Sequence, residues 1–158
     1  MPHSIPLFYR LFFLYFDPLI CLSGIYLSFF DQHTFIQNGV PSALSGSITS
    51  SAEILPLAAY FMRSVGSYSV SIFALQILLL HQFKDAPNGL NVKIWRTLQF
   101  AILLIDLGLM YSVFEASPIE FLDVGGWSSG DWTNNGILGV VIVLRTAFLL
   151  GIGGVEKV

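Results

Sequence analysis

The stretch RLFFLYFDPLICL, Arg10–Leu22, places an arginine and an aspartate seven residues apart in an otherwise apolar sequence. An α-helix completes a turn every 3.6 residues, so Arg10 and Asp17 are predicted to share one helix face. A charged side chain is costly in an apolar segment unless it faces inward, pairs with another charge or reaches the interface. The charges within the apolar segments are therefore the first candidates for function.

The composition around this stretch is typical of a membrane protein. Of the 158 residues, 54% are hydrophobic and 11% are charged, whereas a soluble domain carries about 25% charged residues. The length predicts one domain, covering residues 1–158. The net charge of −3 and the pI near 5.4 give no basic surface, so no nucleic acid partner is expected. With one cysteine (Cys21) and three scattered histidines, neither a disulfide nor a metal site is predicted.

Four stretches are long and apolar enough to cross a bilayer, which takes about 20 residues. They cover residues 5–30, 54–83, 92–114 and 132–151. The first is too long for a cleaved signal peptide and lacks a small-residue cleavage site, so we interpret it as a retained span. These features predict an all-α, integral-membrane four-helix bundle in which sequential helices pack antiparallel.

The connections between the spans differ in charge. Residues 31–53 and 115–131 contain no lysine or arginine, whereas the middle connection has Lys84 and Lys93, with Arg96 just beyond it. By the positive-inside rule, the middle connection and both termini are expected to be cytoplasmic. We predict a multi-pass protein of the endoplasmic reticulum membrane, in contact with membrane lipids. The sequence leaves open whether the protein forms a homo-oligomer. An aromatic belt is predicted from tryptophans near span ends: Trp95, Trp127 and Trp132.

Five ionisable residues lie within the predicted spans: Arg10, Asp17, Arg63, Asp106 and Arg145. Each costs about 2.5–3.5 kcal/mol at the centre of a membrane helix, so these side chains must face inward, pair or snorkel. Asp17 lies twelve residues into the first span and Asp106 fourteen into the third. At about 1.5 Å of rise per residue, both carboxylates are expected near the midplane. Arg10 is shallow and can snorkel.

Each of these charges also has a structural explanation. Snorkelling or a structural ion pair explains Arg10 as well as a catalytic role does, and Arg145 can pair with Asp17 or Asp106 to hold the bundle together. Two midplane carboxylates on different helices are harder to explain in this way, because burying a carboxylate costs several kcal/mol. We therefore predict Asp17 and Asp106 as catalytic residues, assisted by Arg63 or Arg145.

The third span carries a polar stripe. Gln99, Leu103, Asp106 and Met110 recur at helical spacing, and Tyr111 lies on a neighbouring face. Tyrosines of the second and third spans can add hydroxyl groups, although anchoring at the membrane interface explains any single one of them. The predicted substrate-binding side chains are Arg10, Tyr60, Gln99, Met110 and Tyr111.

Proton transfer in a dry pocket is the chemistry that suits these residues. Burial favours the neutral form of a carboxyl group and a nearby arginine favours the ionised form, so two aspartates can divide acid and base roles. Such a pair suits opening an epoxide, and equally protonating an alkene in a cyclisation or double-bond isomerisation. The chain lacks HExxH, P-loop and dinucleotide-binding motifs, so no cofactor is predicted. The substrate is expected to be a lipophilic small molecule.

Several segments resemble, in order, a fungal family of small four-span membrane proteins catalogued as a domain of unknown function. They are PLFYRLFFLYFDP (Pro6–Pro18), KIWR, IDLGLMYS, GDWTN and LRTAFLLGIG, and together they extend over nearly the whole chain. Relatives often carry a histidine after Asp-Leu-Gly, where Leu109 stands here, which removes a proton carrier. Arg63 lies outside the family pattern.

The family resemblance extends to fungal secondary metabolism. The sequence is similar to membrane epoxide hydrolases of polyene-pyrone polyketide pathways, such as those of aurovertin and citreoviridin. This implies a cofactor-independent enzyme that opens epoxides of a lipophilic polyketide by hydrolysis or cyclisation, with Asp17 and Asp106 as acid and base and an arginine between them. A looser similarity to membrane terpene cyclases and sterol-isomerase-like bundles leaves a terpenoid cyclase or double-bond isomerase open. A non-enzymatic lipid-binding or assembly protein is the alternative from another class.

Overall fold

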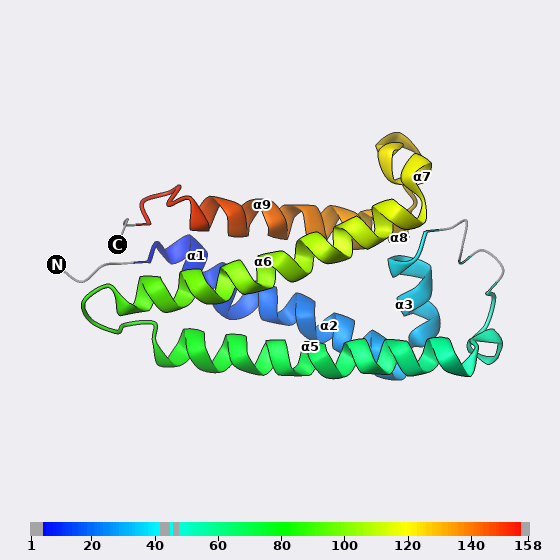
Figure 1. The fold of residues 1–158 in the computed structure, drawn as a ribbon, viewed down its shortest axis with the longest axis horizontal. Helices are drawn as coiled ribbons and strands as arrows, with labels where there is room; N and C mark the ends of the chain where they lie inside the picture. The colour runs from blue at the N-terminus through cyan, green and yellow to red at the C-terminus, as the bar shows by residue number, and fades with distance from the viewer. Residues whose placement is uncertain (1–4, 42–44, 46–47, 156–158) are drawn as a thin grey trace.

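The computed structural model describes residues 5–41, 45 and 48–155. Within these ranges every regular element is helical, and four helical runs are long and apolar enough to cross a membrane (Figure 1). They cover Leu7–Phe30, Pro56–Gln82, Leu90–Ala116 and Ser129–Leu149. The four predicted spans are thus confirmed as helices, with every boundary within three residues of the prediction.

Two of the runs are continuous helices and two contain a π-helical turn. The elements of the four runs are α1 (Leu7–Leu11), η1 (Phe12–Phe16) and α2 (Asp17–Phe30); α5 (Pro56–Gln82); α6 (Leu90–Ala116); and α8 (Ser129–Asp131), η4 (Trp132–Gly136) and α9 (Ile137–Leu149). In a π-turn the N–H pairs with the carbonyl five residues back, which changes which side chains share a face.

Local sequence signals fix where the long runs begin. Pro56 occupies the first turn of α5, where its missing N–H costs no helical hydrogen bond. Gly89 precedes α6 with φ of 72°, a left-handed conformation that favours glycine. The fourth run starts with a capping box: Ser128 Oγ accepts from the Asp131 N–H at 3.2 Å, and Asp131 Oδ2 accepts from the Ser128 N–H at 2.9 Å.

A short helix, α3 (Gln32–Gly39), crosses one end of the bundle and was not predicted from the sequence. It begins at Asp31, whose carboxylate accepts from the Thr34 N–H at 3.1 Å. Hydrogen bonds from the Thr34 hydroxyl and N–H lower the pKa of Asp31, so this cap is complete at neutral pH and is lost as the pH falls through that lowered value. Because α3 contacts α8 and η4, it ties the first connection to the start of the fourth run.

The other short elements lie in the connections. They are η2 (Ser51–Glu53), α7 (Pro118–Leu122) and η3 (Val124–Gly126). Both α3 and α7 lie at the end of the bundle opposite the α5–α6 connection (Figure 1). The bundle therefore has one end with short helices and one end where the first and last long helices meet the middle connection.

The main hydrophobic core lies at this second end. The Tyr9 hydroxyl donates to the Ile152 carbonyl at 3.0 Å, and Arg10 Nη2 lies 3.1 Å from Asp85 Oδ1 in the α5–α6 connection. The core side chains come from all four runs: Ile5, Tyr9, Phe13, Leu14, Leu80, Val92, Trp95, Phe148 and Val155. Trp95 is 0% exposed, so the prediction that it belongs to an interfacial aromatic belt is wrong: its ring packs in the core.

Beyond the core, the helices associate mainly as two pairs, α2 with α5 and α6 with α9. The first pair is in close contact at Gly66, where an added Cβ would overlap Ser28 Oγ and lie 2.8 Å from Phe29 Cε2. Small residues at a helix crossing allow this close approach. Ser28 itself is buried and donates to the Ile25 carbonyl at 2.8 Å.

Gly66→Ala is expected to destabilise the bundle by about 1–3 kcal/mol, because the added methyl group overpacks the α2–α5 contact. The matched control is Gly24→Ala on α2, since no atom lies within 4 Å of a Cβ at Gly24. The measurement is the free energy of unfolding in mixed detergent and SDS micelles. Equal stabilities of the two variants would contradict the close packing at Gly66.

Candidate functional site

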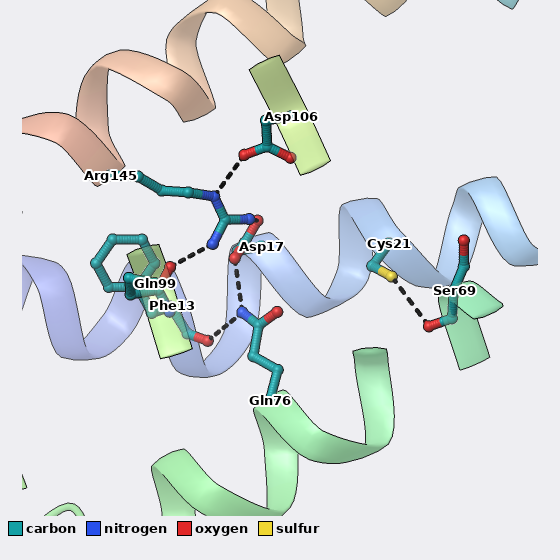
Figure 2. Close-up of polar contacts among 8 residues, drawn as sticks. All are labelled: Phe13, Asp17, Cys21, Ser69, Gln76, Gln99, Asp106 and Arg145. Carbon is teal, nitrogen blue, oxygen red and sulfur yellow. Dashed lines mark hydrogen bonds and ion pairs between the residues drawn. The ribbon is translucent and has the colours of Figure 1, made fainter. Parts of the chain in front are cut away.

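A buried polar cluster centred on Arg145 joins the four long helical runs (Figure 2). Arg145 Nε donates to Asp106 Oδ2 at 2.7 Å, Nη2 donates to Asp17 Oδ1 at 2.8 Å, and Nη1 donates to Gln99 Oε1. Arg145 is 3% exposed, Asp17 4% and Asp106 7%. The sequence-based expectation that an arginine lies between the two aspartates is met by Arg145.

The position of Arg145 on α9 explains how its side chain reaches this point. The residue lies one turn before the end of α9 at Leu149. Side chains on a helix lean toward its N-terminus, so the guanidinium is directed away from the nearby helix end and toward the middle of the bundle. There its Cζ lies 5.9 Å from the centre of the Phe13 ring, within the range of a cation–π contact.

The π-turn before Asp17 sets the position of the first carboxylate. The Asp17 N–H pairs with the Phe12 carbonyl, and Pro18, the next residue, has no N–H. A helical carbonyl accepts from the N–H four or five residues later. For the Phe13 carbonyl these positions are Asp17, whose N–H is already used, and Pro18, which has no N–H. Gln76 Nε2 on α5 donates to this carbonyl instead, at 3.0 Å, and also donates to Asp17 Oδ2 at 2.6 Å.

Gln76 was not among the predicted site residues. Its sequence signal is a single amide inside the apolar run FALQILLL of α5, which by itself does not indicate a partner. In the structure Gln76 is 1% exposed and connects Asp17 with the Phe13 backbone. It therefore positions the Asp17 carboxylate from the side opposite Arg145.

The two carboxylates differ in how completely they are bound. Both Asp17 oxygens accept hydrogen bonds, from Arg145 and from Gln76. Asp106 Oδ2 accepts from Arg145, whereas its Oδ1 accepts no hydrogen bond from the described residues. The Asp106 side chain is 10% exposed, compared with 5% for Asp17. Asp106 Oδ1 is therefore the carboxylate oxygen of the cluster that is free to contact another molecule.

Two apolar grooves lie along the helical runs that carry the cluster. The first, of about 380 Å³, runs between the first and fourth helical runs and is lined by Phe12, Ile20, Trp132, Gly136, Ile137, Val140 and Val141. Ile20 lies one turn from Asp17, and Val141 lies one turn from Arg145. The second, of about 680 Å³, is lined by α2 residues between Leu19 and Phe30. Neither lining includes Asp17 or Asp106, so the grooves reach the neighbours of the cluster and not its carboxylates.

The third-span stripe is confirmed as an inward-facing row on α6. Gln99, Leu103 and Asp106 are buried, and Met110 is half-buried, with its Cε 4.0 Å from the position of a Cβ at Gly139 on α9. The stripe therefore faces α9, which carries Arg145.

Other predicted site residues lie away from the cluster. Tyr60 and Tyr111 are 64% and 61% exposed, and Arg63 lies on the exposed face of α5. Arg10 pairs with Asp85 in the α5–α6 connection and shares no partner with Asp17. Of the two arginines predicted to assist the aspartates, only Arg145 contacts them among the described residues.

Comparison with known proteins places this arrangement in a family. Residues 2–155 match the family described as "Domain of unknown function (DUF7704)". The chain belongs to this family. No curated protein and no solved structure matches the chain. The family description names no activity, so the resemblance to epoxide hydrolases stays a prediction.

Arg145→Met is expected to destabilise the bundle by about 3–5 kcal/mol, because it leaves two buried carboxylates without their cation. The matched control is Arg63→Met, which removes an arginine from an exposed face and is expected to change the stability little. The measurement is SDS-induced unfolding of the purified protein in micelles. If both variants unfold like the wild type, the ion pairs of Arg145 do not stabilise the bundle.

Gln76→Leu is expected to cost about 1–3 kcal/mol, because the buried Phe13 carbonyl and Asp17 Oδ2 lose their amide donor. Pro18→Ala supplies a backbone N–H that can pair with the Phe13 carbonyl. In the Pro18→Ala background, Gln76→Leu is therefore expected to cost less than in the wild type. A double-mutant cycle measures this coupling, and strictly additive effects would show that Gln76 does not compensate for the missing proline N–H.

Proposed function

We propose that this protein is a membrane-embedded acid–base enzyme that opens an epoxide on a lipophilic small molecule, with Asp106 as the proton donor. The observation that carries the proposal is the free Oδ1 of Asp106, while the other three carboxylate oxygens of the cluster accept hydrogen bonds. A carboxyl oxygen that contacts a substrate must be available in this way, whereas a purely structural ion pair does not require it.

The charge balance of the cluster supports the same assignment. The cluster contains one guanidinium and two carboxyl groups, so it carries a net charge of −1 if both aspartates are ionised. An uncompensated charge in an apolar interior is strongly unfavourable, and one proton on a carboxyl group removes it. Donors on both oxygens of Asp17 favour its ionised form. The proton is therefore assigned to Asp106.

In the proposed reaction, the neutral Asp106 donates its proton to the epoxide oxygen as one C–O bond breaks. A water molecule forms the new C–O bond at the opened carbon, and the product is a vicinal diol. The proton lost by the attacking water returns to the Asp106 carboxylate, so the enzyme ends in its starting state. Arg145 keeps Asp106 in position and stabilises its transient negative charge.

The placement in a bilayer is part of the proposal. Four helices of sufficient length and apolar composition support it, as does the apolar groove between the first and fourth runs, where a lipophilic molecule can bind. Lys84 and Lys93 lie at the end of the bundle where the first and last helices meet the middle connection. The proposed location is the endoplasmic reticulum membrane, with this end and both termini on its cytoplasmic side.

A non-enzymatic membrane protein is the second candidate, and one observation favours it. Both aspartates are ion-paired with Arg145, so the cluster can serve to hold four helices in register without any reaction. In that case the grooves hold lipid, and a neutral substitution at Asp106 affects stability alone. Separating the effects on turnover and on stability therefore distinguishes the two candidates.

Asp106→Asn is expected to lower kcat/KM for a lipophilic epoxide by at least about 10²-fold, because an amide cannot donate the carboxyl proton. The assay uses protein in nanodiscs, a panel of long-chain aliphatic, aromatic and polyene epoxides, and mass spectrometry of ¹⁸O incorporation from labelled water. Glu115→Gln, a neutralised carboxylate on the exposed face of the same helix, is the matched control and is expected to retain full turnover.

The unfolding free energy of Asp106→Asn is measured in parallel. A folded Asp106→Asn variant with wild-type turnover would rule out the acid role of Asp106. A wild type without turnover on the whole panel, together with a destabilised Asp106→Asn variant, would favour the non-enzymatic candidate.

A further inference from the structure

Three buried nitrogen donors in the described part of the chain have no hydrogen-bond partner, and all three lie on one stretch of α6. They are Trp95 Nε1, Arg96 Nε and Gln99 Nε2. Trp95 and Gln99 are each 0% exposed. A buried N–H group without an acceptor costs about 1–3 kcal/mol. Trp95 and Gln99 lie one helical turn apart, so an acceptor that both share would satisfy two of the three donors.

Trp95 and Gln99 present their donors on the same side of α6. They are four residues apart, which places their side chains one above the other on a helix. The Trp95 ring lies 6.4 Å, between ring centres, from Phe148 of α9, and Gln99 Oε1 accepts from Arg145 of α9. Both side chains therefore face α9, and Gln99 leans along α6 toward Trp95.

The orientation of the Gln99 amide is fixed by its neighbour. Arg145 Nη1 is a donor, so it must meet the oxygen of the amide and not the nitrogen. Rotating the amide by 180° would bring two donors together. The two N–H bonds of Gln99 Nε2 therefore remain directed away from the guanidinium. Flipping the amide would not help, because Arg145 Nη1 would then lose its acceptor.

We propose that a water molecule is bound in the interior between Trp95 and Gln99, accepting hydrogen bonds from Trp95 Nε1 and Gln99 Nε2. Water fits this position better than a substrate oxygen for two reasons. Neither residue lines an apolar groove, and Trp95 belongs to the hydrophobic core, whose buried residues line neither groove. A buried water typically makes about three hydrogen bonds to groups that are otherwise unsatisfied, and this site supplies two donors from one helix.

The position of this water relative to the cluster gives it a functional meaning. Gln99 contacts both the water site and Arg145, and Arg145 contacts Asp106. The site therefore lies directly behind the cluster, on the side of the main core. If this water is the one that opens the epoxide, that role rests on the proposed function. The binding of water at the site does not depend on it.

The test is a water-to-indole NOE measurement on protein with ¹⁵N-labelled tryptophan in micelles. The chain has three tryptophans, and the signal lost in Trp95→Phe identifies the Trp95 indole. We expect the Trp95 indole proton to exchange slowly with bulk solvent and yet to show a direct NOE to water. Trp127, whose indole donates to the carbonyls of Glu120 and Phe121, provides the comparison for a protein acceptor. A Trp95 indole with NOEs to protein protons alone would overturn the proposal.

Hydroxyl-radical footprinting of the wild type tests the site without any substitution. The labelling rate of each side chain is divided by its rate in the denatured chain. Leu80 is the matched control, because it is also 0% exposed and packs in the same core. We expect Trp95 to retain labelling that Leu80 loses, and equal protection of the two would contradict a bound water.

The Asp106→Asn variant separates this inference from the proposed reaction. The water site does not involve Asp106 directly, so the Trp95-to-water NOE is expected to persist in that variant whether or not the protein is an enzyme. An intact NOE with no turnover in the wild type would disprove the reaction alone. Full turnover without a water NOE would disprove the water site alone.

Discussion

The guanidinium of Arg145 is the interaction on which the arrangement of the bundle depends. Its three nitrogens bind acceptors on α2 and α6, and Asp17 continues the contact through Gln76 to α5. In an apolar interior a donor without an acceptor is costly, because bulk solvent does not replace the missing partner. The rotation of each long helix about its own axis is thereby constrained by one side chain.

The packing on either side of this cluster differs. On one side, apolar side chains from all four runs form a single core. On the other side, the helices associate as the pairs α2–α5 and α6–α9, and an apolar groove separates the first run from the fourth. The cluster thus lies where the continuous core gives way to two pairs of helices. This is a position where a polar group can be held rigidly and still lie near an apolar groove.

The sequence was sufficient to predict the parts of this arrangement that depend on hydrophobicity and charge. The spans follow from apolar length. An arginine between Asp17 and Asp106 was expected, but the sequence left Arg63 and Arg145 as alternatives. The sequence did not predict the role of Gln76, since an amide has no obligatory partner, nor the π-turn that orients Asp17. Trp95 was assigned to an interface because it lies near a span end, but the tight packing of α6 against α9 at this end buries it.

The predicted roles of Arg63, Tyr60 and Tyr111 show a further limit of sequence reasoning. Helical periodicity relates residues within one helix, but it does not state which face meets the neighbouring helices. Contact with α2 is made through Gly66, so Tyr60 and Arg63 point outward, in agreement with their exposure. Among the described residues, Arg145 and not Arg63 contacts the two aspartates.

The number of carboxylates in the cluster bears on the choice between a structural and an enzymatic role. Arg145 and Asp17 alone would form a neutral pair that links α9 to α2, with Gln99 accepting from Arg145 Nη1 and Gln76 donating to Asp17 Oδ2. Asp106 adds a second negative charge and leaves one of its own oxygens without a donor. A structural link gains little from this, because an asparagine at the same place would accept from Arg145 Nε without an uncompensated charge. A protonated Asp106 would explain both the second carboxyl group and the oxygen without a donor. The proton removes the extra charge, and on Oδ1 it can be donated to another molecule.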